Sequence, residues 1–236
     1  MENEQLNQYL VNKGFTVDDL LNASAVFLDN GNIKHSQKDL SWLETKLEAV
    51  TTEGEKQLFT PLDIVNKKKF QYQMDNCNSA IFIPLFKLNG EFTGFSIRKM
   101  CDKKHDSWFV PGSRKIDLLY NLSNAFEHAI AKNSIIVTEG VYDTIALVKY
   151  GFKNSVALLG THMSNLQFFQ LMSIVENIAL CLDDDEAGVN AMDRIMKEHT
   201  GDVTYWRVNI DKDPDEFLSQ NGSDVFRKRI YKCVKN

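Results

Sequence analysis

Residues Ile135–Leu147 read IIVTEGVYDTIAL, and this stretch decides the fold of the second half of the chain. A run of β-branched residues, typical of a buried strand, ends at Glu139 and Gly140. Asp143 follows at the start of an apolar pattern with helical spacing. The stretch therefore predicts a strand, a short turn and a helix. Acids near a helix N-terminus complement its dipole, so capping is the simplest interpretation of the two acids.

The same alternation of strand and helix continues to residue 208. Apolar strands are expected at residues 155–160 (SVALLG), 177–185 (NIALCLDDD) and 203–208 (VTYWRV), with helices between them at 164–175 and 187–199. Continuous apolar strands joined through helices are typical of a parallel sheet that is covered by helices. The sequence predicts an α/β fold from about residue 130.

The first half of the chain has a mixed pattern of helical and strand spacing, which predicts a smaller α+β subdomain. Helical spacing indicates helices at Glu4–Lys13 and Gln37–Val50. Ala80–Phe86 and Phe92–Ile97 are expected to be strands joined by a tight turn at Asn89-Gly90. We therefore expect three parts: an α+β subdomain over residues 1–130, the parallel sheet over 131–222, and a C-terminal helix within 223–236, from Asp224 to Val234.

Composition excludes several classes of protein. The chain has 236 residues, 43% of them hydrophobic, and a net charge of −5, so any surface for a polyanion must be a local patch. The four cysteines form no C-x-x-C pair, which argues against a zinc ribbon or a disulfide framework. No apolar run approaches the length that spans a membrane. We expect a cytoplasmic protein without a membrane partner.

Acidic residues follow three of the predicted strands or their connections. They are Glu139 with Asp143, then Asp183, Asp184 and Asp185, then Asp213 and Asp215. Each group alone has a simpler interpretation as a helix cap or a solvated turn. The carboxyl ends of parallel strands meet at one edge of a sheet, so we expect the groups to converge. Converging carboxylates repel one another, and oxygen ligands suit Mg²⁺ or Mn²⁺, so the pattern predicts a divalent metal site.

The motifs EGVYD, LDDDEAG and KDPDEFL resemble the TOPRIM domain shared by bacterial DnaG-type primases, type IA and type II topoisomerases and some nucleases. The KDPDE form, together with the order IFIPLFKLNGEFTGFSIRK, KIDLLYNL and IIVTEGVYD, resembles the RNA-polymerase core of DnaG-type primases over about residues 78 to 220. This resemblance implies a TOPRIM-type parallel sheet. The implied metal-site acids are Glu139, Asp143, Asp183, Asp185, Asp213 and Asp215, with Glu139, Asp183 and Asp185 as the catalytic ones.

Basic residues are concentrated before the acidic half of the chain. The resemblance implies that Arg98, Lys99 and Lys115 line a groove for nucleic acid and nucleotide. Lys103 and Lys104 belong to the same basic segment, and we expect them to contribute to nucleic-acid binding. The alternative for a lysine run is a solvated surface with no ligand.

The function that the resemblance implies is that of a DNA primase, which makes short RNA primers on single-stranded DNA from NTPs with Mg²⁺ or Mn²⁺. The alternatives are a TOPRIM nuclease and a non-catalytic protein that binds nucleic acid or a replication partner. A replicative helicase or a separate zinc-binding subunit is an expected partner, in the cytoplasm of a bacterium or a phage-infected host. One departure stands out: the family has D-G-D followed by arginine, whereas this chain has Asp184 and Glu186 at those places.

Overall fold

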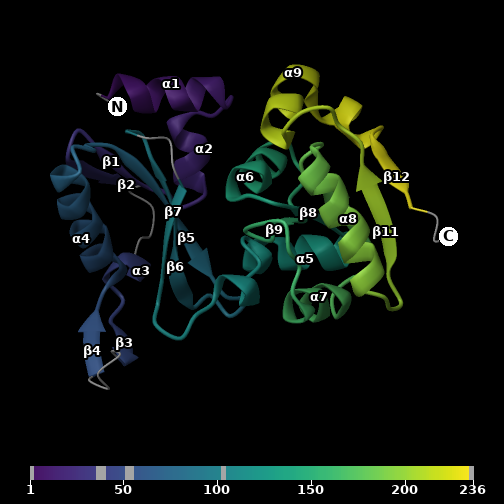
Figure 1. Ribbon diagram of the computed structural model, residues 1–236, viewed down its shortest axis with the longest axis horizontal. Coiled ribbons are helices and arrows are strands. Elements are labelled where there is room, and N and C mark those ends of the chain that lie inside the picture. The colour runs from purple at the N-terminus through teal and green to yellow at the C-terminus, as the bar shows by residue number, and fades with distance from the viewer. Residues whose placement is uncertain (1–2, 36–40, 51–55, 102–104, 234–236) are drawn as a thin grey trace. The chain divides into compact units, whose positions relative to one another are not determined.

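The computed structural model describes residues 3–35, 41–50, 56–101 and 105–233. The chain divides into two compact units (Figure 1). The N-terminal unit comprises residues 1–85 and 92–113, and the C-terminal unit comprises residues 86–91 and 114–236. The boundary expected near residue 130 falls within helix α5 (Leu122–Lys132), which belongs to the C-terminal unit.

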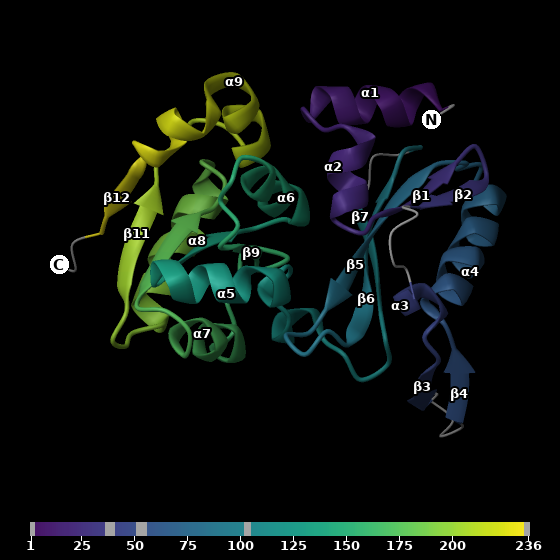
Figure 2. The same ribbon diagram turned by 180° about the vertical axis from the view of Figure 1, so that it is seen from behind.

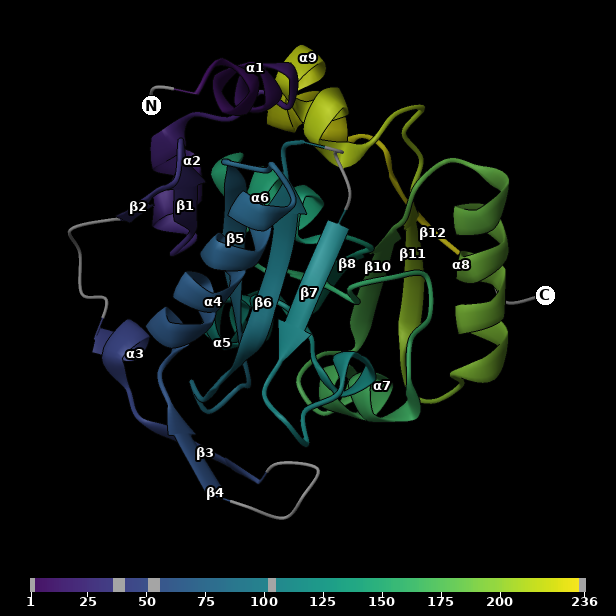
Figure 3. The same cartoon turned by 60° about the vertical axis from the view of Figure 1, so that its left-hand side comes forward.

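The N-terminal unit is built on a five-stranded sheet with the order β2-β1-β5-β6-β7. Its strands are β1 (Val26–Asp29), β2 (Asn32–His35), β3 (Leu47–Val50), β4 (Lys56–Phe59), β5 (Ala80–Phe86), β6 (Phe92–Lys99) and β7 (His105–Phe109). Its helices are α1 (Glu4–Asn12), α2 (Val17–Asn22), α3 (Ser41–Glu44) and α4 (Pro61–Met74). Strands β3 and β4 pair only with each other among the described residues, and Figure 3 shows this ribbon extending beyond the five-stranded sheet.

Two expectations for this unit have opposite outcomes. The predicted strands Ala80–Phe86 and Phe92–Ile97 are neighbours in the sheet as β5 and β6, and Gly90 in the turn has a φ of 81°. The helix predicted over Gln37–Val50 is wrong: residues 36–40 lie outside the described part, α3 is one short turn, and Leu47–Val50 forms β3. Pairing with β4 supplies the backbone hydrogen bonds of that segment, and such tertiary pairing overrides helical spacing.

The C-terminal unit is the predicted parallel sheet. Its strands are β8 (Ser134–Thr138), β9 (Ser155–Ala157), β10 (Asn177–Cys181), β11 (Thr204–Val208) and β12 (Ile230–Lys232), in the order β12-β11-β10-β8-β9. Its helices are α5, α6 (Val141–Lys149), α7 (Asn165–Met172), α8 (Glu186–Glu198) and α9 (Pro214–Arg227), with the 3-10 turn η1 (Lys115–Asp117). Strands β8, β9, β10 and β11 pair in parallel. This confirms the expected fold class.

The expected helix Asp224–Val234 is wrong. Helix α9 ends at Arg227, and Ile230–Lys232 pairs antiparallel with β11 as the edge strand β12. Gly222 breaks the helical backbone within α9 with a φ of 76°. The short helical segment after that break buries Phe226 and ends at Arg227. The open edge of β11 then supplies backbone partners for Ile230–Lys232.

Helices cover both faces of the sheet, as a parallel sheet requires. Alternate strand residues such as Ile135, Val137, Ile178 and Leu180 are buried in one cluster with α5, α7 and α8. Helix α6 packs on β8 and β9 at the other face, and α9 packs against α6, as Figure 2 shows from behind. Successive side chains of each strand point to opposite faces of the sheet, so alternate residues contact different sets of helices.

The order of the strands fixes where a ligand can bind. From β8 the chain crosses to β9 on one side and then returns past β8 to β10 on the other side. Such a reversal opens a crevice at the carboxyl ends of the two strands that flank it. Glu139 directly follows β8, and Asp183 follows β10 by two residues. Both acids therefore stand at the switch point of the sheet.

Helix α8 approaches the end of β10 so closely that only glycine fits at the contact. A Cβ at Gly188 would lie 2.0 Å from the carbonyl oxygen of Asp183 and 2.9 Å from its carbonyl carbon. These are backbone atoms, which cannot rotate away. Gly188 therefore sets how near the first turn of α8 comes to Asp183.

We predict that Gly188→Ala lowers the free energy of unfolding by about 2 kcal/mol or more, because the added methyl must push α8 away from β10. Urea denaturation measures this change. Gly201→Ala is the matched control, since a Cβ there would meet the ends of the Met172 and Phe168 side chains at ordinary distances of 3.5 Å and 3.7 Å. Equal stability of the two variants would contradict the close contact.

Candidate metal centre

Glu139 and Asp143, the two acids of the opening stretch, have different roles in the turn after β8. Gly140 is the N-cap residue before α6, and its backbone N–H donates to Oδ2 of Asp143 at 3.3 Å. Asp143 is thus the capping acid. Glu139 takes no part in that cap: its Oε1 is buried and accepts no hydrogen bond within the part of the chain that the structure describes. The capping interpretation therefore holds for Asp143 and leaves Glu139 unexplained.

The second acidic group follows β10. Asp185 caps α8, with its Oδ1 accepting the backbone N–H of Gly188 at 2.7 Å. Asp184 is exposed and lies 3.8 Å from Arg207 of β11 in an ion pair. The backbone N–H of Asp183 donates to the Glu139 carboxylate, which joins the ends of β8 and β10.

The electrostatics of Glu139 show which acids surround it. Burial is the largest cause that raises the pKa of Glu139, and the charge of Asp183 is the next. The hydrogen bond from the Asp183 backbone offsets part of this, while Asp185 and Asp213 add further repulsion. These acids come from separate loops, so charges from separate loops act together on Glu139. A metal site shared by all of the acids stays a prediction.

The remaining predicted acids lie at the edges of this group. Burial raises the pKa of the Cys181 thiol, and the nearby charges of Asp143 and Asp183 raise it further, which places both acids beside the end of β10. Asp213 is the residue before α9. Asp215 is 2% exposed, and its Oδ1 accepts the N–H of Glu216 at 2.8 Å. Asp215 is therefore a buried residue of the first turn of α9.

The acids have the right donor atoms for a hard divalent ion, but their side chains lie too far apart to hold one as they stand. All of the donors are carboxylate oxygens, and a buried oxygen of Glu139 has no hydrogen bond from the described residues. No three Asp, Glu, His or Cys side chains among those same residues lie close enough to hold an ion as they stand. Mutual repulsion spreads carboxylates apart, and an ion would draw them together. The sheet sets the backbone positions of these acids, and their side chains can rotate toward an ion.

Lys115 is the predicted basic residue of the C-terminal unit, which also carries the acids. It begins η1, and its Nζ lies 3.5 Å from the position that a Cβ at Gly160 would take. The N–H of Gly160 in turn donates to the carbonyl oxygen of Glu139 at 3.0 Å. A short path therefore connects the ammonium group of Lys115 to the turn that carries Glu139.

The other predicted basic residues belong to the N-terminal unit. The Arg98 guanidinium lies over the Tyr9 ring at 5.3 Å, and Lys99 Nζ lies over the Tyr72 ring at 5.7 Å. Lys103 and Lys104 lie outside the described residues. A role for these four in a groove with the acids stays a prediction.

Arg207 is a charged residue near the acids that follow β10, and the sequence patterns did not indicate it. It lies on β11 directly opposite Leu180 of β10, and it pairs with Asp184. Its Nε is buried without a hydrogen-bond partner among the described residues. The signal in the sequence is a lone arginine one residue before the end of an apolar strand, followed by the KDPDE segment.

The sequence of this chain is similar to those of known proteins. Residues 136–218 match the family described as Toprim-like. A DNA primase of Clostridium acetobutylicum is 32% identical over 177 residues, which cover 72% of this chain and 29% of that protein. This chain spans about 30% of the length of such relatives.

Solved primase structures share the fold. A crystal structure of the Aquifex aeolicus primase with its zinc-binding and RNA polymerase domains has a TM-score of 0.68 at 21% identity, covering 98% of this chain and 57% of that one. A DnaG primase catalytic domain bound to single-stranded DNA has a TM-score of 0.63 at 20% identity, covering 96% of this chain and 73% of that one. At these identities the likeness concerns the fold alone.

The raised pKa of Glu139 gives a prediction for stability against pH. The folded state binds the Glu139 proton more tightly than the unfolded state, so the parent loses stability as the pH rises from the ordinary glutamate pKa of 4.5 through the raised pKa of the folded state. In a buffer with a chelator, Glu139→Gln should raise Tm by a few degrees at neutral pH, and the difference should vanish below about pH 4. Thermal melts across pH measure this.

Glu127→Gln on the exposed face of α5 is the matched control and should leave Tm unchanged at each pH. A neutral-pH Tm of Glu139→Gln equal to or below that of the parent would contradict the repulsion at Glu139.

Proposed function

The chain is homologous to the catalytic core of DnaG-type DNA primases and contains a Toprim-like domain, and we propose that it synthesises short RNA primers on single-stranded DNA from NTPs. The observation that carries the proposal is the Glu139 carboxylate: half-buried, with one oxygen lacking a hydrogen bond from the described residues, and repelled by acids of two other loops. A carboxylate kept in that state at a switch point fits a role toward a cation or a proton.

We propose Glu139, Asp183 and Asp185 as the catalytic acids, with Asp143, Asp213 and Asp215 completing the set that holds Mg²⁺ or Mn²⁺. A bound divalent ion supplies positive charge at the reacting phosphate. Capping does not remove Asp185 from this role, because its cap uses Oδ1 and leaves Oδ2. Asp143 likewise receives the Gly140 N–H at one oxygen. The helix caps hold these carboxylates in fixed directions.

Glu139 has two roles that its environment supports. It can hold the metal ion, or it can accept the proton of the attacking 3′-hydroxyl group. A base works best when its pKa lies near the working pH, and burial with the Asp183 charge raises the pKa of Glu139 in that direction. Both roles require the charge of this residue.

We propose that Lys115 contacts the nucleotide or template phosphates next to the acids, and that Arg98, Lys99, Lys103 and Lys104 hold single-stranded DNA. A similar primase domain has been solved with single-stranded DNA, which supports this choice of ligand. A replicative helicase or a separate zinc-binding subunit is the partner we propose, in the cytoplasm of a bacterium or a phage-infected cell. No helix in the described part of the chain is long and apolar enough to cross a bilayer.

The deciding experiment incubates the protein with single-stranded DNA, labelled NTPs and Mg²⁺ or Mn²⁺, and resolves the products on a gel. We expect a ladder of short RNAs from the parent. Glu139→Gln should reduce primer synthesis roughly 10²-fold or more, because either role needs the carboxylate. Asp183→Ala should also abolish Mn²⁺ binding by calorimetry while the fold is kept.

Glu127→Gln serves as the control for both measurements. Loss of the DNA in place of RNA ladders would identify a nuclease, and neither product from a folded, Mn²⁺-binding protein would identify a non-catalytic binder. Primer synthesis by Glu139→Gln at the parent rate would remove Glu139 from the mechanism.

A second prediction concerns the basic residues. Lys115→Ala and Arg98→Ala should each weaken binding of single-stranded DNA and reduce the salt dependence of log K by about 0.7, the value for one lost phosphate contact. Fluorescence anisotropy over a salt series measures both. Lys197→Ala on the exposed side of α8 is the control. Parent-like slopes for Lys115→Ala and Arg98→Ala would leave these residues as solvated charges.

A further inference from the structure

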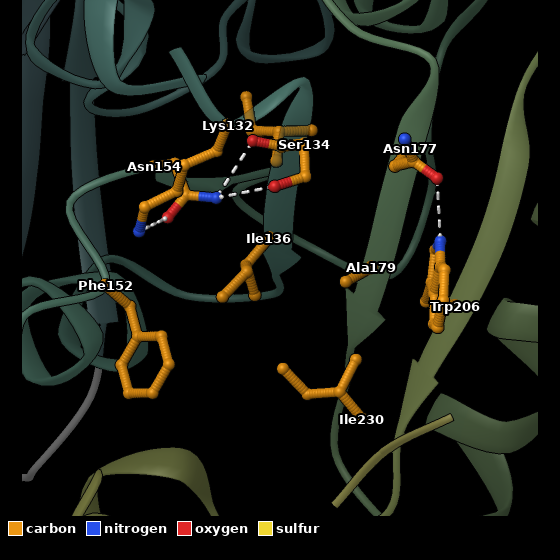
Figure 4. Close-up of a pocket in the computed structure, with 10 residues that line it drawn as sticks. Lys132, Ser134, Ile136, Phe152, Asn154, Asn177, Ala179, Trp206 and Ile230 are labelled. Carbon is orange, nitrogen blue, oxygen red and sulfur yellow. Dashed lines mark hydrogen bonds between the residues drawn. The ribbon is translucent and has the colours of Figure 1, made fainter. Parts of the chain in front are cut away.

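Two lysines of the C-terminal unit, Lys132 and Lys115, differ in their contacts. Lys132 lies beside a pocket of about 400 Å³ at the start of β8 and β10, and its Nζ donates to Oδ1 of Asn154 at 3.0 Å (Figure 4). Lys115 lies near Gly160, and its ammonium group has no hydrogen bond or ion pair among the residues that the structure describes. Of these two lysines, Lys115 is therefore the one that is available to a ligand.

The arginine next to Lys115 already has a counter-ion. Arg114 donates to both carboxylate oxygens of Asp117, from Nε at 2.8 Å and from a terminal nitrogen at 2.9 Å. Such a two-point pair is directional and occupies the whole carboxylate. Asp117 is the only acid in the segment 114–117. The pair therefore balances the charge of Arg114 and leaves the charge of Lys115 for a ligand.

Gln167 of α7 connects the segment that carries Lys115 to the loop after β9. The Gln167 side chain is fully buried. Its Nε2 donates to the carbonyl oxygen of Leu118 at 2.6 Å and to the carbonyl oxygen of Leu158 at 3.3 Å. Leu118 directly follows η1, and Leu158 directly follows β9. One amide group thus joins two segments that are distant in the sequence.

The first turn of α7 holds this amide group and η1 together. Oε1 of Gln167 accepts the backbone N–H of Ser164 at 2.8 Å, and the Ser164 hydroxyl accepts the backbone N–H of Gln167 at 3.1 Å. This reciprocal pair is a capping box. The Ser164 hydroxyl also donates to the carbonyl oxygen of Ile116, within η1, at 2.6 Å. Two side chains of one helix turn therefore fix the backbone on both sides of the segment Ile116–Leu118.

The loop that Gln167 holds also contacts the turn that carries Glu139. The N–H of Gly160 donates to the carbonyl oxygen of Glu139 at 3.0 Å. Lys115 Nζ lies 3.5 Å from the position that a Cβ at Gly160 would take. Hydrogen bonds therefore run from η1 through Gln167 to the loop after β9, and from that loop to the turn of Glu139.

We propose that Gln167 is a positioning residue, which holds η1 so that the ammonium group of Lys115 meets a phosphate group beside the turn of Glu139. A lysine side chain is long and flexible, so the position of its backbone decides which phosphates it can reach. A buried amide is costly unless its hydrogen bonds are made, which keeps η1 and the loop at a fixed separation. This inference rests on the proposed binding of phosphate by Lys115 and on no step of primer synthesis.

The test is a double-mutant cycle on phosphate binding, with Lys115→Ala, Gln167→Met and the double variant. Methionine keeps the length of the side chain and removes both donors. Anisotropy measures the binding of labelled single-stranded DNA and, with Mn²⁺ present, of a fluorescent ATP analogue. Gln167→Met should weaken, by about threefold or more, the same ligand that Lys115→Ala weakens. It should cause no further loss once Lys115 is replaced. The ligand that responds identifies the phosphate as that of the nucleotide or of the template.

Gln170→Met on the same helix is the matched control, because Oε1 of Gln170 accepts no hydrogen bond from the described part of the chain. It should bind both ligands like the parent. Thermal melts by circular dichroism check that each variant is folded at the assay temperature. If Gln167→Met does not fold, Ser164→Ala takes its place in the cycle with the same expectation, because it removes the hydroxyl donor to Ile116.

Parent-like binding of both ligands by a folded Gln167→Met would overturn the inference. An equal loss with and without Lys115 would also overturn it, because Gln167 would then act on binding by another route. Unchanged binding by Lys115→Ala would overturn it as well, since no contact would remain to be positioned. A coupled loss in a protein that makes no RNA primers would uphold the inference while the proposed function fails.

Discussion

Repulsion between Glu139 and the acids of the neighbouring loops is the interaction on which the arrangement of the C-terminal unit depends. A half-buried carboxylate whose pKa is raised by burial first, and then by the charges of Asp183, Asp185 and Asp213, costs stability at neutral pH. The sheet beneath it must therefore be rigid. The buried cluster on one face of the sheet, the hydrogen bond from the Asp183 backbone and the contact of Gly188 with that backbone all hold the acids against their own repulsion.

The acids differ in whether they cap a helix. Asp143 and Asp185 do cap the helices that follow them, and Glu139 does not. The two roles are compatible, because a carboxylate that accepts one backbone N–H retains acceptor capacity on both oxygens. A cap also fixes the rotamer of the side chain. Starting helices directly after strands is thus a way to aim carboxylates at one point.

The sequence predicts most of the fold that carries the acids, because that part follows from local patterns. Strands β8 and β10 and the turns after them are visible in runs of apolar residues ending in acids. The failures depend on pairing between distant segments: Leu47–Val50 has helical spacing but pairs with β4, and Ile230–Lys232 pairs with β11. The pocket lined by Ile136, Ala179 and Trp206 could not be predicted for the same reason, because these three residues meet only when β8, β10 and β11 pair in register.

Asp184 shows how a local departure from a motif is balanced by the fold. An extra carboxylate within the D-D-D segment would add to the repulsion at Glu139 if it faced the same way. Asp184 instead forms an ion pair with Arg207 of β11 at 3.8 Å. An ion pair that is partly exposed is weak in itself. Its value here is directional, because it gives the middle carboxylate a cation of its own on β11.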